Sequence, residues 1–292
     1  MSKPSIAILG GGRLGGALAG LVNDCGYPVV AITARSQETL AAISKATALP
    51  VCFDNVEAAA QADLILLTVP DRILPVVLDE LIAGKRLRLG QVLLHTSGVL
   101  AGEALAPARQ FGVAVGSMHP LQSFADRETA RKNIPGSPFA IDGDAAAVDA
   151  ASRLVNDLGG TILRVPPEER VLYHAAACIA SNYLVALLHT AEKLLMRWTS
   201  DESAALQSLL PLVKGTLRNV AQQGTASALT GPIVRGDSST VARHLQALPE
   251  DFKTVYQILG QETLKLVGNR IPLSQRETIA QLLGASTFKE TK

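Results

Sequence analysis

The chain has 292 residues, 48% of them apolar, and its 27 Lys and Arg nearly balance 26 Asp and Glu. This length suffices for two modest domains with buried cores, and the composition excludes a disordered chain. No basic run resembles a phosphate-backbone footprint, so no nucleic-acid partner is predicted. The three cysteines are far apart and odd in number, so we expect no disulfide framework and no metal site.

Short apolar runs alternate with helical patterns through the first half of the chain. The predicted strands are residues 6–10, 28–33, 63–69, 91–95, 113–117, 138–141 and 161–165, and the predicted helices are residues 14–25, 38–47 and 145–158. The runs 63–69 and 91–95 are continuously apolar, which is typical of strands buried on both faces of a parallel sheet. This alternation predicts a doubly wound α/β sheet.

The second half contains only helical patterns, which begin after Pro166 and Pro167. They cover residues 168–197, 201–223, 239–247, 251–269 and 274–283. We therefore expect an α/β domain over residues 1–165 and an all-α domain over residues 166–292, with the proline pair as the boundary.

No segment is predicted to cross a membrane. The apolar start of the chain is interrupted by Arg13 and five glycines, unlike a signal peptide. The most apolar later stretch, residues 174–188, contains Ser181 and Asn182 and is too short to span a bilayer. A soluble, cytoplasmic protein is expected.

A glycine-rich turn joins the first predicted strand to the first predicted helix. Gly10, Gly12 and Gly15 match G-x-G-x-x-G in the strand–turn–helix context that dinucleotide binding requires. The first glycine permits the turn, the second lets the backbone approach a pyrophosphate, and the third lets the helix pack on the strand. Backbone N–H groups at the helix start, around Arg13 and Leu14, can bind the anion. The pattern predicts a Rossmann domain that binds a nicotinamide dinucleotide.

The residues after the second strand favour NADP(H) over NAD(H). An NAD site would place a carboxylate there to accept from the ribose 2′-OH. This chain instead has Arg35 and Ser36, which can bind a 2′-phosphate, and its first carboxylate is Glu38. The alternative is that Glu38 is the ribose ligand and Arg35 a solvated loop residue. Further along, Val69 and Pro70 close the next strand and are candidates for the nicotinamide wall.

Three polar clusters fall where a substrate could meet the nicotinamide. They are residues 95–98 (HTSG), residues 116–120 (GSMHP), and the helical pair His174 and Asn182. Reduction of a carbonyl needs a proton for the developing alkoxide, and a histidine can supply it. We assign that role to His174, and expect Asn182 to orient the substrate. A close helix contact around a satisfied buried histidine is the alternative.

The other two clusters and one loop supply candidate substrate contacts. Ser97 can anchor a carboxylate, and His119 is a second acid/base or a hydrogen-bond partner of the substrate. Arg235, in the compact loop 230–237, can clamp a carboxylate, with a purely structural turn as the alternative. These groups predict a small substrate that carries a carboxylate.

The chain resembles bacterial Rossmann-like oxidoreductases that carry a C-terminal helical domain of long-unassigned function, relatives of ketopantoate reductase, β-hydroxyacid dehydrogenase, pyrroline-carboxylate reductase and prephenate dehydrogenase. Besides the glycine turn, the motifs that carry this resemblance are TVPD (68–71), HTSG (95–98), MHPLQSF (118–124), YHAAACIASN (173–182) and GPIVRGD (231–237). The resemblance implies NADPH-dependent reduction of a small 2-oxo acid, ketopantoate first, and a homodimer formed through the helical domain. It departs from ordinary ketopantoate reductases because His174 falls where they have a lysine.

Two other functions remain open from the sequence. One is a non-catalytic NADP(H)-binding sensor built on an enzyme scaffold. The other is an oxidation of the β-hydroxyacid or prephenate type, since the same residues serve either direction of hydride transfer. Three polar clusters around the nicotinamide position favour an enzyme, because a sensor does not need acid/base groups there.

Overall fold

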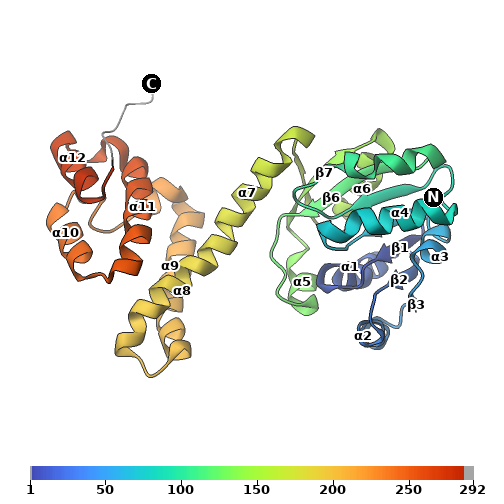
Figure 1. Ribbon diagram of the computed structural model, residues 1–292, viewed down its shortest axis with the longest axis horizontal. Coiled ribbons are helices and arrows are strands. Elements are labelled where there is room, and N and C mark those ends of the chain that lie inside the picture. The colour runs from blue at the N-terminus through green and yellow to red at the C-terminus, as the bar shows by residue number, and fades with distance from the viewer. Residues whose placement is uncertain (1, 286–292) are drawn as a thin grey trace. The chain divides into compact units, whose positions relative to one another are not determined.

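The computed structural model describes residues 2–285, which form two compact units (Figure 1). The first unit ends at Tyr183 and the second begins at Leu184. The division falls inside the first long helical stretch of the second half, because the first turns of that stretch pack with the sheet. The last strand of the sheet ends at Arg164, next to the predicted boundary at 165/166.

The first unit contains an eight-stranded sheet with the order β3-β2-β1-β4-β5-β6-β7-β8. The strands are β1 (Ile6–Leu9), β2 (Val29–Thr33), β3 (Val51–Cys52), β4 (Leu64–Leu67), β5 (Val92–His95), β6 (Ala114–Pro120), β7 (Pro138–Gly143) and β8 (Thr161–Arg164). All neighbours pair in parallel except β6 and β7. The predicted doubly wound sheet is confirmed, and its order over the first six strands is that of a dinucleotide-binding fold.

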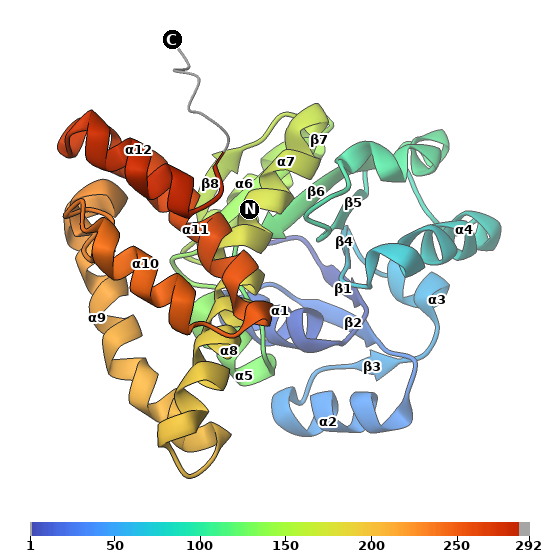
Figure 2. The same cartoon turned by 60° about the vertical axis from the view of Figure 1, so that its left-hand side comes forward.

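Helices cover both faces of this sheet (Figures 1 and 2). They are α1 (Arg13–Asp24), α2 (Gln37–Thr47), α3 (Asn55–Ala60), α4 (Leu74–Gly84), η2 (Gly102–Phe111), α5 (Arg127–Asn133) and α6 (Ala145–Asp157), followed by α7 (Arg170–Ala180). Because side chains alternate along a strand, Ile6 and Ile8 of β1 join the core under α1 and α6, whereas Ala7 and Leu9 join the core under α3 and α4. Every side chain of β1 is thus buried.

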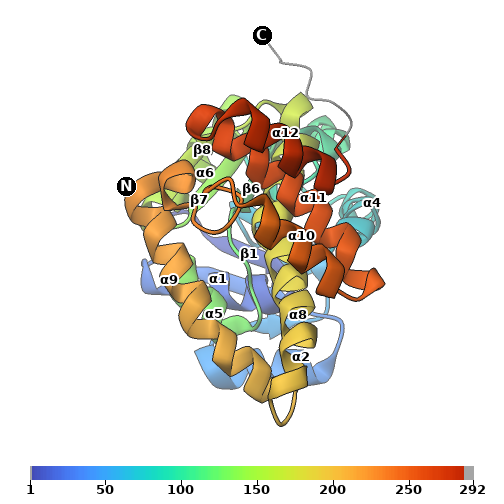
Figure 3. The same ribbon diagram turned by 90° about the vertical axis from the view of Figure 1, so that its left-hand side faces the viewer.

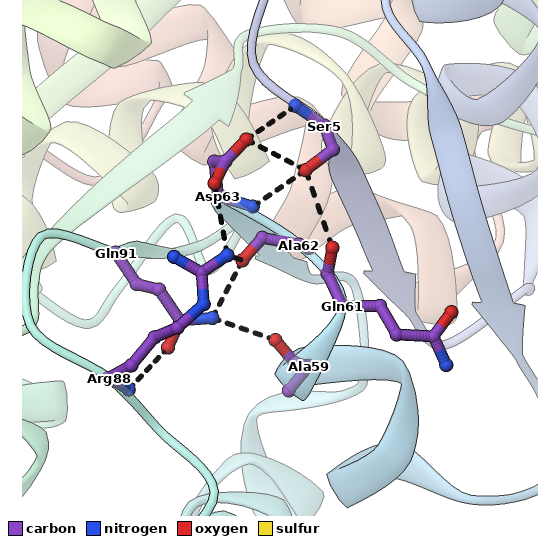
Figure 4. A network of polar contacts seen from close by, with 7 residues as sticks. All are labelled: Ser5, Ala59, Gln61, Ala62, Asp63, Arg88 and Gln91. Atoms are coloured by element: carbon purple, nitrogen blue, oxygen red, sulfur yellow. Dashed lines mark hydrogen bonds and ion pairs between the residues drawn. The ribbon is translucent and has the colours of Figure 1, made fainter.

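The amino ends of the central strands are tied by a polar network (Figure 4). The Asp63 carboxylate accepts from the Ser5 N–H at 3.1 Å, the Ser5 hydroxyl at 2.8 Å and the Arg88 guanidinium at 3.0 Å. The buried Gln91 amide donates to the Ala62 carbonyl at 2.6 Å. Hydrogen bonds therefore hold β1, β4 and β5 together at the edge opposite their carboxyl ends.

Three α-helices of the first unit, α3, α4 and α5, have no counterpart in the sequence predictions, and neither has the 3₁₀ helix η2. α3 and α5 are short and begin at acidic caps: Asp54 accepts from the Glu57 N–H at 2.9 Å, and Asp126 accepts from the Thr129 N–H at 2.8 Å. α4 starts beside a proline in its first turn. The caps and the proline are standard start signals, so local chemistry predicts these starts once the cap residues are considered.

The second unit is helical, as predicted. It contains most of α8 (Asn182–Leu195), then α9 (Glu202–Ala228), α10 (Ser238–Ala247), α11 (Glu250–Val267) and α12 (Leu273–Leu282). Figure 3 shows α10, α11 and α12 grouped together, and their core includes Val241, Leu264 and Ile279. The single helix predicted over residues 168–197 is wrong in one respect, because Ser181 has φ −113° and ψ −67° and separates α7 from α8.

One sequence argument about membranes is corrected by the structure. The helical run Pro167–Trp198 spans 32 residues, and its most apolar 18-residue window has a mean hydropathy of 1.6. By length and composition it could cross a bilayer, contrary to the expectation that this stretch is too short. None of its most apolar window is buried inside the protein. One such helix is weak evidence of a membrane span, and its exposed apolar face requires another explanation.

Candidate functional site

The glycine turn after β1 is held by hydrogen bonds to the neighbouring strands. The N–H groups of Gly10 and Gly11 donate to the Thr33 carbonyl of β2, at 3.2 and 2.6 Å. The Thr68 hydroxyl, just after β4, donates to the Gly10 carbonyl at 2.7 Å. Gly10 has a φ of 113°, which glycine adopts without the steric cost that other residues meet. The turn is therefore fixed between three strands.

Gly12 and Gly15 lack a side chain for different reasons. A Cβ on Gly15 would overlap the Gly10 carbonyl oxygen and the Thr68 hydroxyl, so only glycine lets α1 begin this close to the turn. A Cβ on Gly12 would meet no atom within 4 Å. Contacts within the protein do not require a glycine at position 12, whereas close approach of a pyrophosphate does. The turn therefore fits a dinucleotide.

The start of α1 is electropositive and has no acidic residue in its first turn. The first N–H groups of a helix have no intrahelical acceptor, and the peptide dipoles make this end positive. Arg127 of α5 adds a guanidinium, which donates to the Gly11 carbonyl at 3.1 Å and the Gly12 carbonyl at 3.3 Å. Arg13 is exposed beside them. An anion bound at this turn would balance these charges.

Arg35 and Ser36 follow β2, as predicted, but only the Ser36 side chain has hydrogen-bond partners among the described residues. Arg35 is exposed, and within residues 2–285 it has no hydrogen bond or ion pair. Ser36 caps α2: its oxygen accepts from the Thr39 N–H at 3.2 Å, and its hydroxyl donates to the Thr39 hydroxyl at 2.9 Å. The guanidinium of Arg35 is therefore open to an anion, whereas the Ser36 hydroxyl would have to rotate. Glu38 is exposed in the first turn of α2.

Val69 and Pro70 lie at the carboxyl end of β4, next to the glycine turn. A Cβ on Gly10 would come 2.9 Å from Cγ1 of Val69, so the Val69 side chain borders the turn. Pro70 is exposed and precedes a short 3₁₀ turn. Both residues sit at the point where strand order reverses between β1 and β4, the usual ligand position in open α/β sheets.

His95 ends β5 fully buried and shapes the loop that follows. Its Nε2 lies 2.9 Å from the Ala101 carbonyl and its Nδ1 accepts from the Ser97 N–H at 3.1 Å, which places the proton on Nε2. Burial lowers the pKa of His95. The Ser97 hydroxyl oxygen accepts from the N–H groups of Val99 and Leu100, at 3.2 and 3.0 Å. Ser97 is buried and orders this loop, with only its hydroxyl hydrogen left to donate.

Gly98, His119 and His174 meet at one point, although they come from three separate sequence clusters. A Cβ on Gly98 would lie 2.5 Å from Cδ2 of His174 and 2.8 Å from Nε2 of His119. The two imidazole centroids are 6.1 Å apart at an interplanar angle of 69°. Both β5 and β6 run parallel to β1 and β4, so this cluster shares the carboxyl edge of the sheet with the glycine turn.

Tyr173 positions the His119 ring. Its hydroxyl lies 2.8 Å from Nδ1 of His119, with the rings edge to face. Burial, together with the charge of Arg170 and the neighbouring His174, lowers the pKa of His119 to about 4, so its ring is neutral at pH 7. Burial raises the pKa of Tyr173, which keeps its hydroxyl protonated. When that hydroxyl donates to Nδ1, the His119 proton sits on Nε2, facing Gly98.

A buried ion pair attaches α7 to the sheet beneath these rings. Nε of Arg170 donates to the Asp142 carboxylate of β7 at 2.7 Å, and the two side chains are 1% and 7% exposed. The same carboxylate accepts from the Ser117 hydroxyl at 2.8 Å and the Gly102 N–H at 2.5 Å. Arg170 also lies 5.9 Å from the centre of the Tyr173 ring. This pair therefore fixes the first turn of α7, and with it the side chains of Tyr173 and His174.

Two predicted site residues are not part of this cluster in the first unit. Asn182 is exposed at the start of α8, and no hydrogen bond joins it to the histidines among residues 2–285. Arg235 is exposed in the loop between α9 and α10, which belongs to the second unit. Cys178, one helical turn after His174, places its sulfur 3.7 Å from Nδ1 of that histidine. The cluster in the first unit thus consists of Gly98, His119, Tyr173 and His174.

Sequence reasoning missed four residues of this site. Tyr173 directly precedes His174, and Arg170 lies one helical turn before it, so helical spacing alone could have drawn attention to both. Asp142 and Arg127 come from distant segments with no local motif. Their roles depend on the antiparallel direction of β7 and on α5, neither of which was among the sequence predictions.

Two family profiles match the chain, one over its α/β part and one that extends into its helical part. Residues 1–120 match a Rossmann-like domain profile, and residues 137–263 match a domain of unknown function, DUF2520. No functionally curated protein matches the chain.

Several solved structures share its fold. A candidate NADP oxidoreductase, BF3122 from Bacteroides fragilis, superposes with a TM-score of 0.73 at 22% identity, over 89% of this chain and 98% of the other. Protein TM1727 from Thermotoga maritima gives 0.63 at 25% identity, over 95% and 96%. The pyrroline carboxylate reductase of Plasmodium falciparum with NADP bound gives 0.58 at 13% identity, over 97% and 99%. The chain thus shares the fold of these structures, and its two parts match the Rossmann-like and the DUF2520 profiles in turn.

Proposed function

We propose that the protein is an NADP(H)-dependent oxidoreductase that reduces a carbonyl group of a small, carboxylate-bearing substrate, with the 2-oxo acid ketopantoate as the first candidate. The observation that carries this proposal is the meeting of Gly98, His119 and His174 at the sheet edge that also holds the glycine turn. A protein that only binds the cofactor has no need for two adjacent imidazoles there.

The cofactor would be held by residues of the first unit. The N-terminus of α1, Arg127 and the open face of Gly12 suit the pyrophosphate, and Arg35 suits a 2′-phosphate. Bound NADPH supplies a hydride. Val69 and Pro70 would border the nicotinamide, since they close β4 beside the turn.

The two imidazoles have different roles in this proposal. His119 is neutral at pH 7 and its Nε2–H, fixed by Tyr173, donates a hydrogen bond to the substrate oxygen. His174 is partly exposed and delivers the proton to that oxygen as the alkoxide develops. Ser97 can add a hydroxyl donor from the loop after β5.

A spectrophotometric assay of NADPH oxidation tests the function directly. The purified protein is mixed with NADPH or NADH and a panel of 2-oxo acids led by ketopantoate, with a cyclic imine carboxylate included because several structural neighbours are pyrroline carboxylate reductases. Oxidation of NADPH that depends on one panel member establishes a reductase. Tight NADPH binding without turnover, in this direction or with hydroxyacids and NADP⁺, would replace the enzyme proposal with a sensor.

Arg35 is expected to discriminate between the two cofactors. Because its guanidinium has no partner in residues 2–285, replacing it by alanine removes only the contact with a 2′-phosphate. Arg35→Ala should raise the dissociation constant for NADPH about tenfold or more, and leave NADH binding nearly unchanged, since charge-assisted hydrogen bonds contribute about 1.5–3 kcal/mol. Fluorescence titration of both cofactors measures this. Equal losses for NADPH and NADH would show that Arg35 does not bind a 2′-phosphate.

Arg127 is expected to bind the cofactor phosphates, and α5 offers a matched control. Arg127 lies against Gly16 and the glycine turn, whereas Arg131, one turn later, lies against Gly20 and pairs with Asp24. Arg127→Gln should weaken binding of both cofactors about tenfold, because the same pyrophosphate is common to them. Arg131→Gln should leave both dissociation constants within a factor of two. Similar losses in the two variants would show that α5 acts only by supporting α1.

The two histidines should separate in their kinetic effects. His174→Ala is expected to lower kcat about 100-fold or more, the usual contribution of a general acid. His119→Gln should chiefly raise KM, and by the same factor at every pH of the series, because His119 is already neutral above about pH 4. Steady-state kinetics between pH 5 and 9 distinguishes them. If His174→Ala retained a near-wild-type kcat, another group would have to deliver the proton.

We also propose that the protein is a soluble cytoplasmic homodimer joined through the helical domain. Large apolar residues of α8 are exposed, and α8 and α11 line an apolar cavity of about 380 Å³ that includes Leu187, Val255 and Leu259. A second copy would cover these side chains, which explains an apolar helix with an unburied face. Sedimentation should give a dimer that Leu187→Asp disrupts and Leu89→Asp, at an exposed position of the first unit, does not.

A further inference from the structure

Three potential metal ligands meet where α8 leads into α9. The side chains are His189 and Glu192 of α8 and Glu202, the first residue of α9. Nδ1 of His189 lies 3.7 Å from Oε2 of Glu192 and 3.9 Å from Oε1 of Glu202. One ligand atom from each of the three residues lies within 4.8 Å of the other two. All three belong to the second unit, whereas the proposed cofactor residues and the histidine cluster belong to the first.

Glu192 is the unusual member of this group. Its side chain is only 10% exposed, and the one ionic partner found for it among residues 2–285 is His189, at a distance longer than a hydrogen bond. A carboxylate this buried is ordinarily paired with a cation or satisfied by several donors. The nearby Asp201 carboxylate is already occupied, since it accepts from the Ala204 N–H at 2.8 Å and the Ser200 hydroxyl at 3.0 Å. Among residues 2–285, no cationic side chain other than His189 is recorded within ion-pair distance of the Glu192 carboxylate.

The arrangement of donors suits a divalent cation. Residues three apart on a helix share a face, so His189 and Glu192 can both turn toward one ion, and Glu202 completes a third side from the next helix. An imidazole nitrogen with carboxylate oxygens is a donor set used for zinc and similar first-row ions, with metal–ligand distances of about 2.0–2.2 Å. The three ligand atoms lie within 4.8 Å of one another, a spacing from which a common ion is within reach of all three side chains.

We propose that His189, Glu192 and Glu202 form a divalent metal site, with Zn²⁺ as the best-matched ion and water in the remaining position. The site would bridge the end of α8 and the start of α9, and so act on the stability of the helical domain rather than on hydride transfer. It is independent of the proposed function, and it departs from our expectation, drawn from the spacing of the cysteines, that the protein has no metal site.

The experiment uses the full-length protein, from which bound metal is removed with a chelator. The chelator is then removed by dialysis. Calorimetric titration with ZnCl₂ and the absorption spectrum with Co²⁺ report binding, and the melting temperature with and without Zn²⁺ reports stabilisation. Wild-type protein is expected to bind one Zn²⁺ at micromolar concentration or below and to melt at a higher temperature with it. Glu192→Gln and Glu202→Gln should each weaken binding at least tenfold and remove the thermal shift.

Glu250→Gln is the matched control, because Glu250 is the first residue of α11 as Glu202 is of α9, but pairs with Lys253 at 2.8 Å. It should bind Zn²⁺ like the wild type. If Glu192→Gln does not fold, the exposed Glu202 decides the question alone. Absence of Zn²⁺ binding, or binding that survives Glu202→Gln unchanged, for instance at the His174 and Cys178 pair, would overturn the proposed site.

Discussion

Replacing Asp142 by asparagine is expected to destabilise the protein by about 3–5 kcal/mol, because it leaves the Arg170 guanidinium buried without a counter-charge. Arg170 is 1% exposed and already has one nitrogen, Nη1, with no hydrogen-bond partner among residues 2–285. The lost carboxylate also held the Ser117 hydroxyl and the Gly102 N–H. Urea unfolding at pH 7, monitored by circular dichroism, measures the change.

Two variants separate this effect from a general sensitivity of the fold. Asp149→Asn breaks an exposed ion pair with Arg153 on α6 and should change the unfolding free energy by less than about 0.5 kcal/mol. Adding Arg170→Met to Asp142→Asn removes the stranded charge and should restore part of the loss. If the single Asp142→Asn variant were as stable as the wild type, the pair would not be what attaches α7 to the sheet.

Gly98→Ala is expected to lower turnover about 100-fold, the cost of displacing catalytic groups by about 1 Å. The new methyl group would lie 2.5 Å from the His174 ring and 2.8 Å from that of His119, so at least one imidazole must move. NADPH affinity should stay close to that of the wild type, since the glycine turn is elsewhere on the sheet edge. Kinetics and cofactor titration on the same preparation check both statements.

Gly215→Ala is the control for this substitution. Gly215 lies within α9, where a Cβ would meet nothing within 4 Å, so alanine should be neutral or slightly stabilising and leave turnover unchanged. Full activity of Gly98→Ala would show that the two imidazoles tolerate separation, and the proposed division of roles between them would have to be abandoned.

Much of the fold could be predicted from the sequence because the signals are local. The seven longer strands start and end within a few residues of their predicted positions, since each is a short apolar run bounded by turn residues. The break at Ser181 could not be predicted in this way, because no glycine or proline marks it. The antiparallel direction of β7 likewise follows from the chain path after β6, through α5, and not from the composition of the strand.

The site was less predictable than the fold. The residue types of the three polar clusters indicated the chemistry, and the structure brings Gly98, His119 and His174 together. The spacing of residues in the sequence could not predict the environment of the two imidazole rings. The desolvation of His119 and its hydrogen bond to Tyr173 arise from packing between β6 and α7. Ser97 illustrates the same limit: its hydroxyl oxygen serves the loop backbone, a role that no motif states.

The polar network of Figure 4 has a consequence for how this protein could diversify. Asp63, Arg88 and Gln91 join the central strands at the amino edge, whereas the loops after β4, β5 and β6 carry the proposed chemistry at the other. Changes in those loops need not disturb the bonds that hold the strands in register. Evolution or protein design could therefore change the substrate preference of this scaffold by substitutions in these loops alone, without altering the sheet.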